Sequence, residues 1–231
     1  MKKQLFLSAA VLLTAGMIWM TGCKKDDTTP PVVTITGANP LTISLNNTSV
    51  ADPFATATDD QDGDIAASSI SSDWSSKVDV NLKGSYTVTY SATDAAGNVG
   101  TATRTVNVIN DAEAFAGTYQ GNETDINGPY TYVQLNTVTA STTVNNRITL
   151  TRLGDFANNT VYINVTGTTL TMPSQTVTNV GTGANPCDIH NRQSDGTGTK
   201  TATGFNLTYN DAKVAPCTGS RTNVAAVFVK Q

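Results

Sequence analysis

Threonine is the feature that most constrains the fold of this chain: 40 of its 231 residues are threonine, whereas 12 are leucine and only two are glutamate. Threonine loses side-chain freedom in a helix but fits the pleated surface of a strand, and leucine and glutamate are common helix formers. Threonine and serine also alternate with apolar residues, as in 86–92, which gives a strand two unlike faces. The sequence therefore predicts an all-β protein.

The N-terminus has the form of an export signal. Lys2 and Lys3 precede an apolar run, Leu5–Met20, that is shorter than the roughly 20 residues a membrane-spanning helix needs. Gly22-Cys23 follows, and this order of charge, apolar run and cysteine resembles the cleavage box of bacterial lipoproteins. The resemblance implies that residues 1–22 are removed and that Cys23 is acylated, so that the protein sits on a membrane. A plain secreted signal with an incidental cysteine is the alternative.

The segment after the cleavage box, residues 23–29, is predicted to be a lipidated, solvated tether. It contains Lys24-Lys25-Asp26-Asp27, which resembles the lysine-acidic export tag of surface-exposed lipoproteins in some Gram-negative bacteria and implies an outer-membrane protein that faces outward. Without Lys2 and Lys3 the chain has 12 basic and 18 acidic residues, a formal charge of −6. This balance excludes nucleic acid as a partner, because nucleic-acid binding requires a basic surface.

Residues 30–110 have the pattern of an Ig-like β-sandwich, with short alternating runs separated by turn signals. The segment 82–88 has the spacing of a tyrosine corner, in which the hydroxyl of Tyr86 bonds back to nearby backbone. Val88 takes the place of the usual cysteine. The core of this sandwich is therefore expected to be held by apolar packing, without a disulfide between the sheets.

The same segment resembles the bacterial Ig-like domain that pesticidal crystal proteins share with many surface lipoproteins. Four motifs carry the resemblance: Pro30-Pro31-Val32-Val33, Ala55-Thr56-Ala57-Thr58-Asp59-Asp60-Gln61-Asp62-Gly63-Asp64, Gly84-Ser85-Tyr86-Thr87-Val88-Thr89-Tyr90 and Asp94-Ala95-Ala96-Gly97-Asn98. The resemblance implies a spacer or adhesion module with no chemistry of its own.

Acidic residues gather in two loops of this predicted sandwich, between strands B and C and between strands F and G, which an Ig sandwich brings to the same end. Five carboxylates and one amide oxygen would meet there: Asp59, Asp60, Asp62, Asp64, Asp94 and Asn98. Such hard oxygen ligands suit Ca²⁺, which would relieve the repulsion between the carboxylates, although the spacing is not that of an EF-hand. Turn formation by aspartate and glycine, with solvated charge, is the alternative.

Residues 111–231 are predicted to form a second β domain. Its eight short runs favour a closed or nearly closed antiparallel barrel, because closure removes unpaired strand edges. The runs are 118–121, 130–138, 147–153, 160–165, 169–177, 199–203, 205–209 and 223–229. Four motifs, 115–119, 170–175, 196–198 and 205–209, resemble the lipocalin-like domains that close many bacterial surface lipoproteins. An eight-stranded barrel holds one small ligand or is filled by side chains, and the sequence leaves both open.

Two cysteines in this domain, Cys187 and Cys217, are predicted to form a disulfide, since exported chains meet an oxidising compartment. Closing that loop would stabilise the fold by roughly 3–4 kcal/mol. The alternative is a zinc ion held by Cys187, His190 and Cys217.

Aromatic residues are the candidate contacts for a sugar or protein ligand. Trp74 is the only tryptophan outside the export signal, and Tyr130 and Tyr132 share one face of a predicted strand. Packing of these rings in the core is the alternative. No nucleophile with a base, pair of carboxylates or phosphate loop stands in a catalytic context, and His190 has no recognisable orienting partner.

Together these patterns predict a non-enzymatic, membrane-anchored lipoprotein of the cell envelope. The Ig-like module would act as a spacer or adhesion unit and present the C-terminal barrel as a recognition domain for a protein or glycan. One alternative is a carrier that binds a small apolar or glycan ligand inside the barrel. Another is an enzyme, because His190 and Asp188 remain unexplained.

Overall fold

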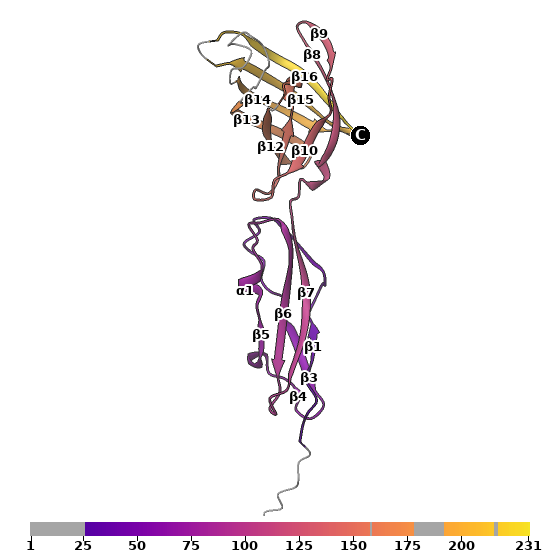
Figure 1. Ribbon diagram of the computed structural model, residues 1–231, viewed down its shortest axis with the longest axis vertical. Coiled ribbons are helices and arrows are strands. Elements are labelled where there is room, and N and C mark those ends of the chain that lie inside the picture. The colour runs from indigo at the N-terminus through magenta and orange to yellow at the C-terminus, as the bar shows by residue number, and fades with distance from the viewer. Residues whose placement is uncertain (1–25, 158, 178–191, 215–216) are drawn as a thin grey trace, which may run out of the picture.

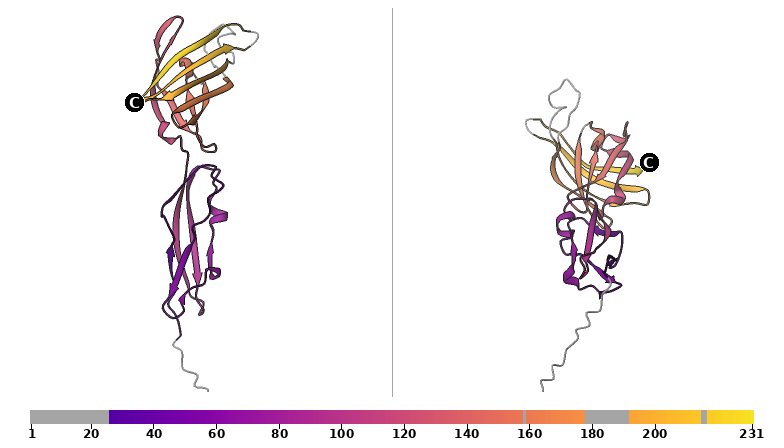
Figure 2. Two further views of the ribbon diagram at one scale, coloured as in Figure 1. Left: turned by 180° about the vertical axis from the view of Figure 1, so that it is seen from behind. Right: turned by 60° about the horizontal axis from the view of Figure 1, so that its bottom comes forward.

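A computed structural model describes residues 26–157, 159–177, 192–214 and 217–231. The described chain is all-β, as predicted, apart from the short helix α1 (Trp74–Lys77) and three 3-10 turns, η1 (Ala67–Ser69), η2 (Glu113–Phe115) and η3 (Leu153–Asp155). Two β units lie end to end, an N-terminal sandwich and a C-terminal barrel (Figure 1; Figure 2). Within the described ranges, no helix has the length and apolar character needed to cross a membrane.

The sandwich consists of a three-stranded sheet, β1-β3-β4, and a four-stranded sheet, β2-β7-β6-β5. Its strands are β1 (Val32–Ile35), β2 (Leu41–Ser44), β3 (Ala55–Asp59), β4 (Gly63–Asp64), β5 (Ile70–Ser72), β6 (Gly84–Thr93) and β7 (Val99–Ile109). β2 runs parallel to β7, whereas the other pairs are antiparallel. In β6 the predicted alternation is confirmed, because Val88, Tyr90 and Ala92 are all fully buried.

The predicted tyrosine corner is present at the start of β6. The hydroxyl of Tyr86 donates to the carbonyl oxygen of Leu82 at 2.6 Å. Val88, in the usual cysteine position, packs in the apolar cluster between the sheets. The barrel has a similar bond, since the hydroxyl of Tyr119 donates to the carbonyl of Phe115 at 2.8 Å. In both units a tyrosine therefore fixes the backbone four residues before it.

The core of the sandwich also contains a charged residue that the alternation pattern does not reveal. Arg104 of β7 is fully buried, and its Nε donates to the hydroxyl of Tyr90 at 3.1 Å. That hydroxyl donates to Asp52 at 2.6 Å. The rest of the guanidinium donates to three backbone carbonyls, those of Thr36, Ala38 and Phe54. A buried charge is tolerated only when it is bonded in this way.

The barrel closes because β8 pairs with both β10 and β16. Its eight strands are β8 (Gly117–Asp125), β10 (Asn136–Ala140), β11 (Arg147–Thr151), β12 (Thr160–Thr166), β13 (Thr169–Val177), β14 (Arg192–Lys200), β15 (Gly204–Lys213) and β16 (Ser220–Lys230). A ninth strand, β9 (Gly128–Thr131), pairs with β8 alone among the described strands and lies outside the closed ring. The predicted lipocalin-like antiparallel barrel is confirmed.

Two of the predicted strand boundaries in the barrel are wrong. The run 130–138 is split into β9 and β10, because the chain turns inward at Tyr132. The run 199–203 is the end of β14 and the turn after it, whereas most of β14 was not predicted. This strand was missed because of its glycines. A Cβ at Gly198 would lie 1.9 Å from the carbonyl oxygen of Asn206, so the close approach of β15 requires glycine.

Side chains fill the interior of the barrel, which answers the question that the sequence left open. Phe205 and Phe228 stack with their ring centroids 4.8 Å apart, and Tyr119 packs edge-on against Phe205. Tyr132 and Tyr209 are also at most 2% exposed. Gly121 makes room for this packing, because a Cβ there would lie 2.3 Å from the ring of Tyr132.

The two units are joined by a hydrogen-bonded junction centred on Asn110, which is fully buried. Its Oδ1 accepts from the amides of Ala112 at 2.9 Å and Asn146 at 3.0 Å. Its Nδ2 donates to the carbonyls of Ser141 (2.8 Å) and Val144 (2.9 Å) in the β10–β11 connection and to that of Arg147 (3.2 Å), where β11 begins. One side chain thus holds the β10–β11 loop of the barrel against the segment that joins the two units.

Residues of the sandwich reinforce this junction from the other side. The amide of Lys83 donates to the carbonyl of Thr142 at 2.8 Å, and the ammonium of Lys83 pairs with Glu113 at 2.6 Å. The side chain of Asn46 accepts from the amide of Asn145 at 2.8 Å. Several bonds from separate segments make this contact stiffer than a simple linker.

Replacing Asn110 with alanine is expected to loosen the junction and to lower the free energy of unfolding by about 2–3 kcal/mol, because buried carbonyl and amide groups lose their partner. Small-angle scattering of the full mature chain would show a broader distribution of domain orientations, and denaturant unfolding would show the loss of stability. Asn127→Ala, at an exposed turn of the barrel, is the control. Identical scattering and stability for Asn110→Ala and the wild type would contradict this role.

The chain enters and leaves the barrel at the same rim. Lys230 of β16 pairs with Tyr119 near the start of β8, and the amide of Gln231 donates to the carbonyl of Thr118 at 3.0 Å. The β8–β9 hairpin lies at the opposite rim (Figure 1), and the β11–β12 connection reaches it through the bond from Tyr130 to Asp155. This distal rim is the part of the barrel farthest from the sandwich (Figure 1).

Candidate functional site

An open pocket of about 510 Å³ lies at the distal rim of the barrel. The β8–β9 hairpin, the η3 turn and the start of β16 surround it, and we call it the distal pocket. Its lining combines two aromatic rings, Tyr130 and Phe156, with polar groups that include Asp125, Asn127 and Arg221. Tyr130 is 45% exposed, so its ring is available to a ligand.

Hydrogen bonds fix the side chains of the distal pocket. The hydroxyl of Tyr130 donates to Asp155 at 2.7 Å, and Arg152 pairs with the same carboxylate at 2.9 Å. Burial alone would raise the pKa of Asp155, but bonds from Tyr130, the amide of Val133 and Arg152 hold it below its ordinary value. Asp155 is therefore ionised at neutral pH and holds Tyr130 in place.

The floor of the distal pocket is a buried ionic network around Glu123, which is 6% exposed. Its Oε1 pairs with Arg221 at 2.7 Å. Its Oε2 accepts from the hydroxyls of Tyr132 at 2.8 Å and Tyr209 at 2.7 Å. Burial raises the pKa of both tyrosines, so that they remain protonated donors.

A second carboxylate, Asp211, extends the network along the barrel interior. Asp211 pairs with Arg221 at 3.3 Å and also with Arg192. The ring of Phe156 lies against both guanidinium groups, 4.9 Å from Arg192 and 5.4 Å from Arg221. Asp125 lies 3.8 Å from Arg221, so three carboxylates surround the two guanidinium groups. The network orders the aromatic wall of the pocket.

The structure separates the three aromatic residues that the sequence singled out. Tyr130 lines the distal pocket. Tyr132 is buried with its hydroxyl bonded to Glu123, so its prediction as a ligand contact is wrong. Trp74 is half-buried and packs against the core of the sandwich, away from the distal pocket. The pocket residues Phe156 and Arg221 were missed, because they come from segments far apart in the sequence.

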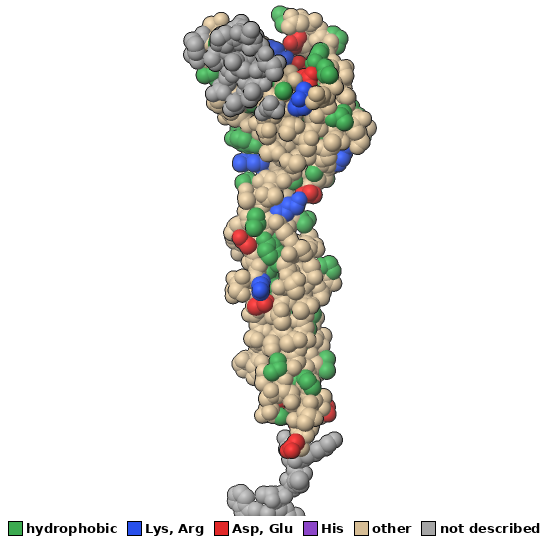
Figure 3. All heavy atoms as spheres, viewed as in Figure 1, with side chains coloured by type: hydrophobic (Ala, Val, Ile, Leu, Met, Phe, Trp, Pro, Cys, Tyr) green, Lys and Arg blue, Asp and Glu red, His purple; other side chains and the backbone are tan. Residues whose placement is uncertain are grey.

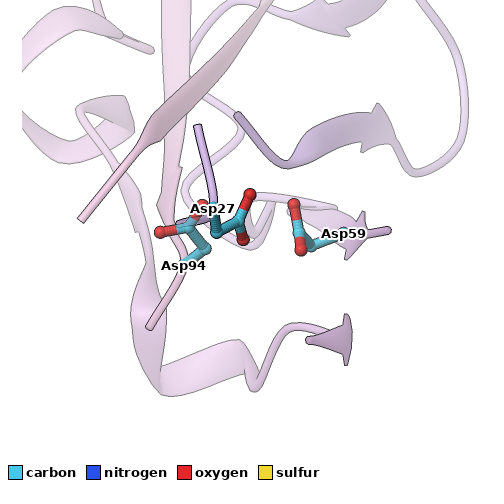
Figure 4. A group of neighbouring side chains, drawn as sticks. All are labelled: Asp27, Asp59 and Asp94. Atoms are coloured by element: carbon cyan, nitrogen blue, oxygen red, sulfur yellow. The ribbon is translucent and has the colours of Figure 1, made fainter. Parts of the chain in front are cut away.

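Three aspartates meet at the opposite end of the molecule, where the chain enters the sandwich: Asp27, Asp59 and Asp94. Each offers a carboxylate oxygen within 4.8 Å of the others, and Asp27 lies between the other two (Figure 4). Acidic side chains are visible on the surface at this end (Figure 3). We call these three residues the acidic cluster.

The predicted meeting of the two acidic loops is confirmed, because Asp62 accepts from the amide of Ala95 at 2.7 Å. Asp94 is buried, and its two oxygens accept from the amide and side chain of Asn98, both at 2.8 Å. Burial would raise the pKa of Asp94, but these bonds hold it below its ordinary value.

Four of the predicted calcium ligands are not in the acidic cluster. Asp60 and Asp64 are exposed, and Asp62 is engaged with the other loop. Asn98 turns its amide nitrogen toward Asp94 and toward the carbonyl of Asp27, so its side chain acts as a donor. Asp27 was missed, because its position in the predicted tether gave no sign that it folds back onto the loops.

Some predicted sites lie outside the described residues. These are the signal peptide and Cys23, as well as Cys187, Asp188 and His190. Cys217 is described and is buried. The disulfide, the zinc alternative and the lipid anchor therefore stay predictions.

A comparison with known families gives a match over the sandwich. Residues 33–108 match the family model described as bacterial surface protein, Ig-like domain. The sandwich is therefore similar to the Ig-like domains of this family. The predicted resemblance is confirmed for this part of the chain, and residues 33–108 are called the Ig-like domain below.

Two solved structures are similar to the chain at low identity. One is described as the crystal structure of the lipoprotein BT2262 from Bacteroides thetaiotaomicron, with 18% identity, coverage of 87% of this chain and 100% of that chain, and a TM-score of 0.32. The other is described as the structure of CBM51-2 in complex with GlcNAc and INT domains from Clostridium perfringens ZmpB, with 21% identity, coverage of 52% and 29%, and a TM-score of 0.27. These TM-scores are too low for either likeness to indicate a shared fold or function. No curated protein matches the chain.

Proposed function

We propose that this protein is a non-enzymatic lipoprotein of the outer membrane, facing outward, that binds a glycan in the distal pocket. The Ig-like domain acts as a spacer between the lipidated Cys23 and the barrel. The observation that carries this proposal is the end-to-end arrangement: the chain enters at one end of the molecule, and the β8–β9 hairpin lies at the other (Figure 1). The distal pocket is lined by this hairpin.

The junction supports the role of a spacer. The bonds around Asn110, together with those of Lys83 and Asn46, hold the barrel against the end of the Ig-like domain. A stiff contact keeps the distal pocket at a constant distance from the anchored end. A membrane-anchored recognition protein benefits from such a spacer, because its ligand then meets the pocket away from the lipid surface.

The chemistry of the distal pocket favours a glycan. Sugars present apolar C–H faces that stack on aromatic rings and hydroxyls that bond to carboxylates, amides and guanidinium groups. Tyr130 and Phe156 supply the rings, and Asp125, Asn127 and Arg221 supply the polar groups. The filled barrel interior argues against the carrier alternative, since a ligand inside it would have to displace buried aromatic side chains.

Tyr130→Ala is expected to weaken binding of the glycan by about fivefold, because the exposed ring contributes on the order of 1 kcal/mol of stacking. The full mature chain in detergent would first be screened on a glycan array, and the affinity for the best glycan would then be measured calorimetrically. Tyr130→Phe, which keeps the ring, should retain most of the affinity. Ile126→Ala, on the exposed tip of the same hairpin, is the control.

Failure of every glycan to bind, or equal binding by the wild type and Tyr130→Ala, would overturn the glycan assignment. A protein partner is the second candidate, because the β8–β9 hairpin and the loop after it expose apolar side chains: Ile126 (98%), Val133 (79%) and Leu135 (46%). The edge of β9 that faces away from β8 pairs with no other described strand and would also accept a strand from a partner. Adhesion that survives Tyr130→Ala but falls with Ile126→Ser would favour this candidate.

A further inference from the structure

We propose that a calcium ion binds between Asp27, Asp59 and Asp94 and clamps the lipidated tether to the base of the Ig-like domain. These residues come from three separate parts of the chain: the tether, the end of β3 and the turn after β6. Their carboxylate oxygens lie within 4.8 Å of one another (Figure 4). An ion at their centre would join the three segments.

Two oxygens of the acidic cluster lack any other partner. The Oδ2 atoms of Asp27 and Asp59 are buried, and within the described ranges they accept no hydrogen bond. The Oδ1 atom of Asp59 accepts from the amides of Gln61 and Asp62, at 2.8 and 3.0 Å, which orients the carboxylate. A buried carboxylate oxygen without a donor is unfavourable, and a cation would satisfy both atoms at once.

The charge of the acidic cluster also requires compensation. Three carboxylates stand together, and within the described part of the chain none of them forms a salt bridge with lysine or arginine. Repulsion between like charges at this separation disfavours the folded arrangement unless a cation is present. The alternative of ordinary turn chemistry explains the Oδ1 bonds of Asp59, but it leaves the two Oδ2 atoms unexplained.

Calcium fits this donor set better than a transition metal. All three ligands are hard carboxylate oxygens, and neither sulfur nor imidazole is among them. Calcium accepts irregular geometry and completes its six to eight ligands with carbonyl oxygens and water. Sites with few protein ligands in extracellular modules bind calcium in the range of about 0.1–1 mM.

The position of Asp27 gives the site its role. Asp27 follows Cys23 by four residues, so even a fully extended segment between them spans at most about 14 Å. The side chain of Asn98 already donates to the carbonyl of Asp27 at 3.2 Å, which brings the segment against the loop after β6. Bound calcium would fix the direction in which the Ig-like domain leaves the membrane.

Calorimetric titration of the full mature chain in detergent micelles, freed of metal by chelation and titrated with calcium chloride, tests the site. We expect one calcium ion per chain and a thermal midpoint, read from Trp74 fluorescence, that rises with calcium and falls again with chelator. Asp27→Asn should weaken binding by about tenfold or more, since a ligand with full charge is lost. Asp60→Asn removes the same charge from an exposed position nearby and should change the affinity by less than about twofold.

Trypsin cleavage after Lys25 tests the clamp itself. Calcium should slow this cleavage in the wild type and not in Asp27→Asn, and the variant also controls for the effect of calcium on trypsin. Absence of calcium binding, or equal weakening by Asp27→Asn and Asp60→Asn, would overturn the site. Calcium binding that leaves the rate of cleavage after Lys25 unchanged would overturn the clamp.

Discussion

Replacing Glu123 with alanine is expected to destabilise the barrel by about 3–5 kcal/mol, because it removes the acceptor of a buried ion pair and of two buried hydroxyl groups. The guanidinium of Arg221 would keep only Asp211 and Asp125 as acidic partners, the latter at 3.8 Å. The hydroxyls of Tyr132 and Tyr209 would also lose the carboxylate to which they donate. The loss is large compared with the total stability of an ordinary domain, so the barrel of this variant is expected to be close to unfolding at room temperature.

Denaturant unfolding followed by two probes measures this effect. Trp74 reports on the Ig-like domain alone, whereas near-ultraviolet circular dichroism follows the buried tyrosines that are concentrated in the barrel. The tyrosine transition should move to lower denaturant while the Trp74 transition stays near its wild-type position. Glu113→Ala breaks a partly exposed pair with Lys83 and should cost less than about 1 kcal/mol.

One single and one double replacement separate the contribution of charge to stability from that of packing in this network. Glu123→Gln keeps the shape and should lose less stability than Glu123→Ala. Joint replacement of Glu123 and Arg221 with leucine and methionine should recover part of the loss, since neither charge is then left unpaired. Equal unfolding midpoints for the wild type and Glu123→Ala would show that the network contributes nothing to stability.

Cys23→Ser is expected to move the protein from the membrane fraction to the soluble fraction almost completely. Two or three acyl chains at about 0.8 kcal/mol per buried methylene give stable anchoring, and serine cannot accept them through a thioether. Fractionation of cells and mass analysis of the N-terminus would measure the change. Thr28→Ser, a similarly small change within the tether, is the control and should stay with the membrane.

Sedimentation of Cys23→Ser with the membrane at the wild-type level would refute the lipid anchor. Protease treatment of intact cells then tests orientation independently, because a protein facing the periplasm would be protected. Loss of both domains on such treatment is the outcome expected for outward display.

Much of the fold follows from local rules in the sequence. The alternation in β6 predicts which side chains are buried, since the side-chain period of a strand is two. The spacing around Tyr86 predicts its bond to Leu82, because this contact spans only four residues. Glycine obscured β14, where small residues permit close strand approach and do not mark a loop.

The candidate sites were harder to predict, because they depend on contacts between distant residues. The acidic cluster joins residues 27, 59 and 94, and nothing in the sequence near Asp27 indicates where the tether lies. The network around Glu123 draws on Tyr209 and Arg221, which are 86 and 98 positions away. Tyr130 and Tyr132 share one face, yet only Tyr132 reaches Glu123 and becomes buried.

Strand β8 begins and strand β16 ends at the same rim of the barrel, which matters for labelling the protein. Gln231 bonds to the start of β8, so a fluorescent tag attached after it would emerge on the side of the barrel turned away from the distal pocket. Such a fusion would leave the β8–β9 hairpin free for ligands. Single-molecule imaging on living cells could then count bound partners without the label competing for the same surface.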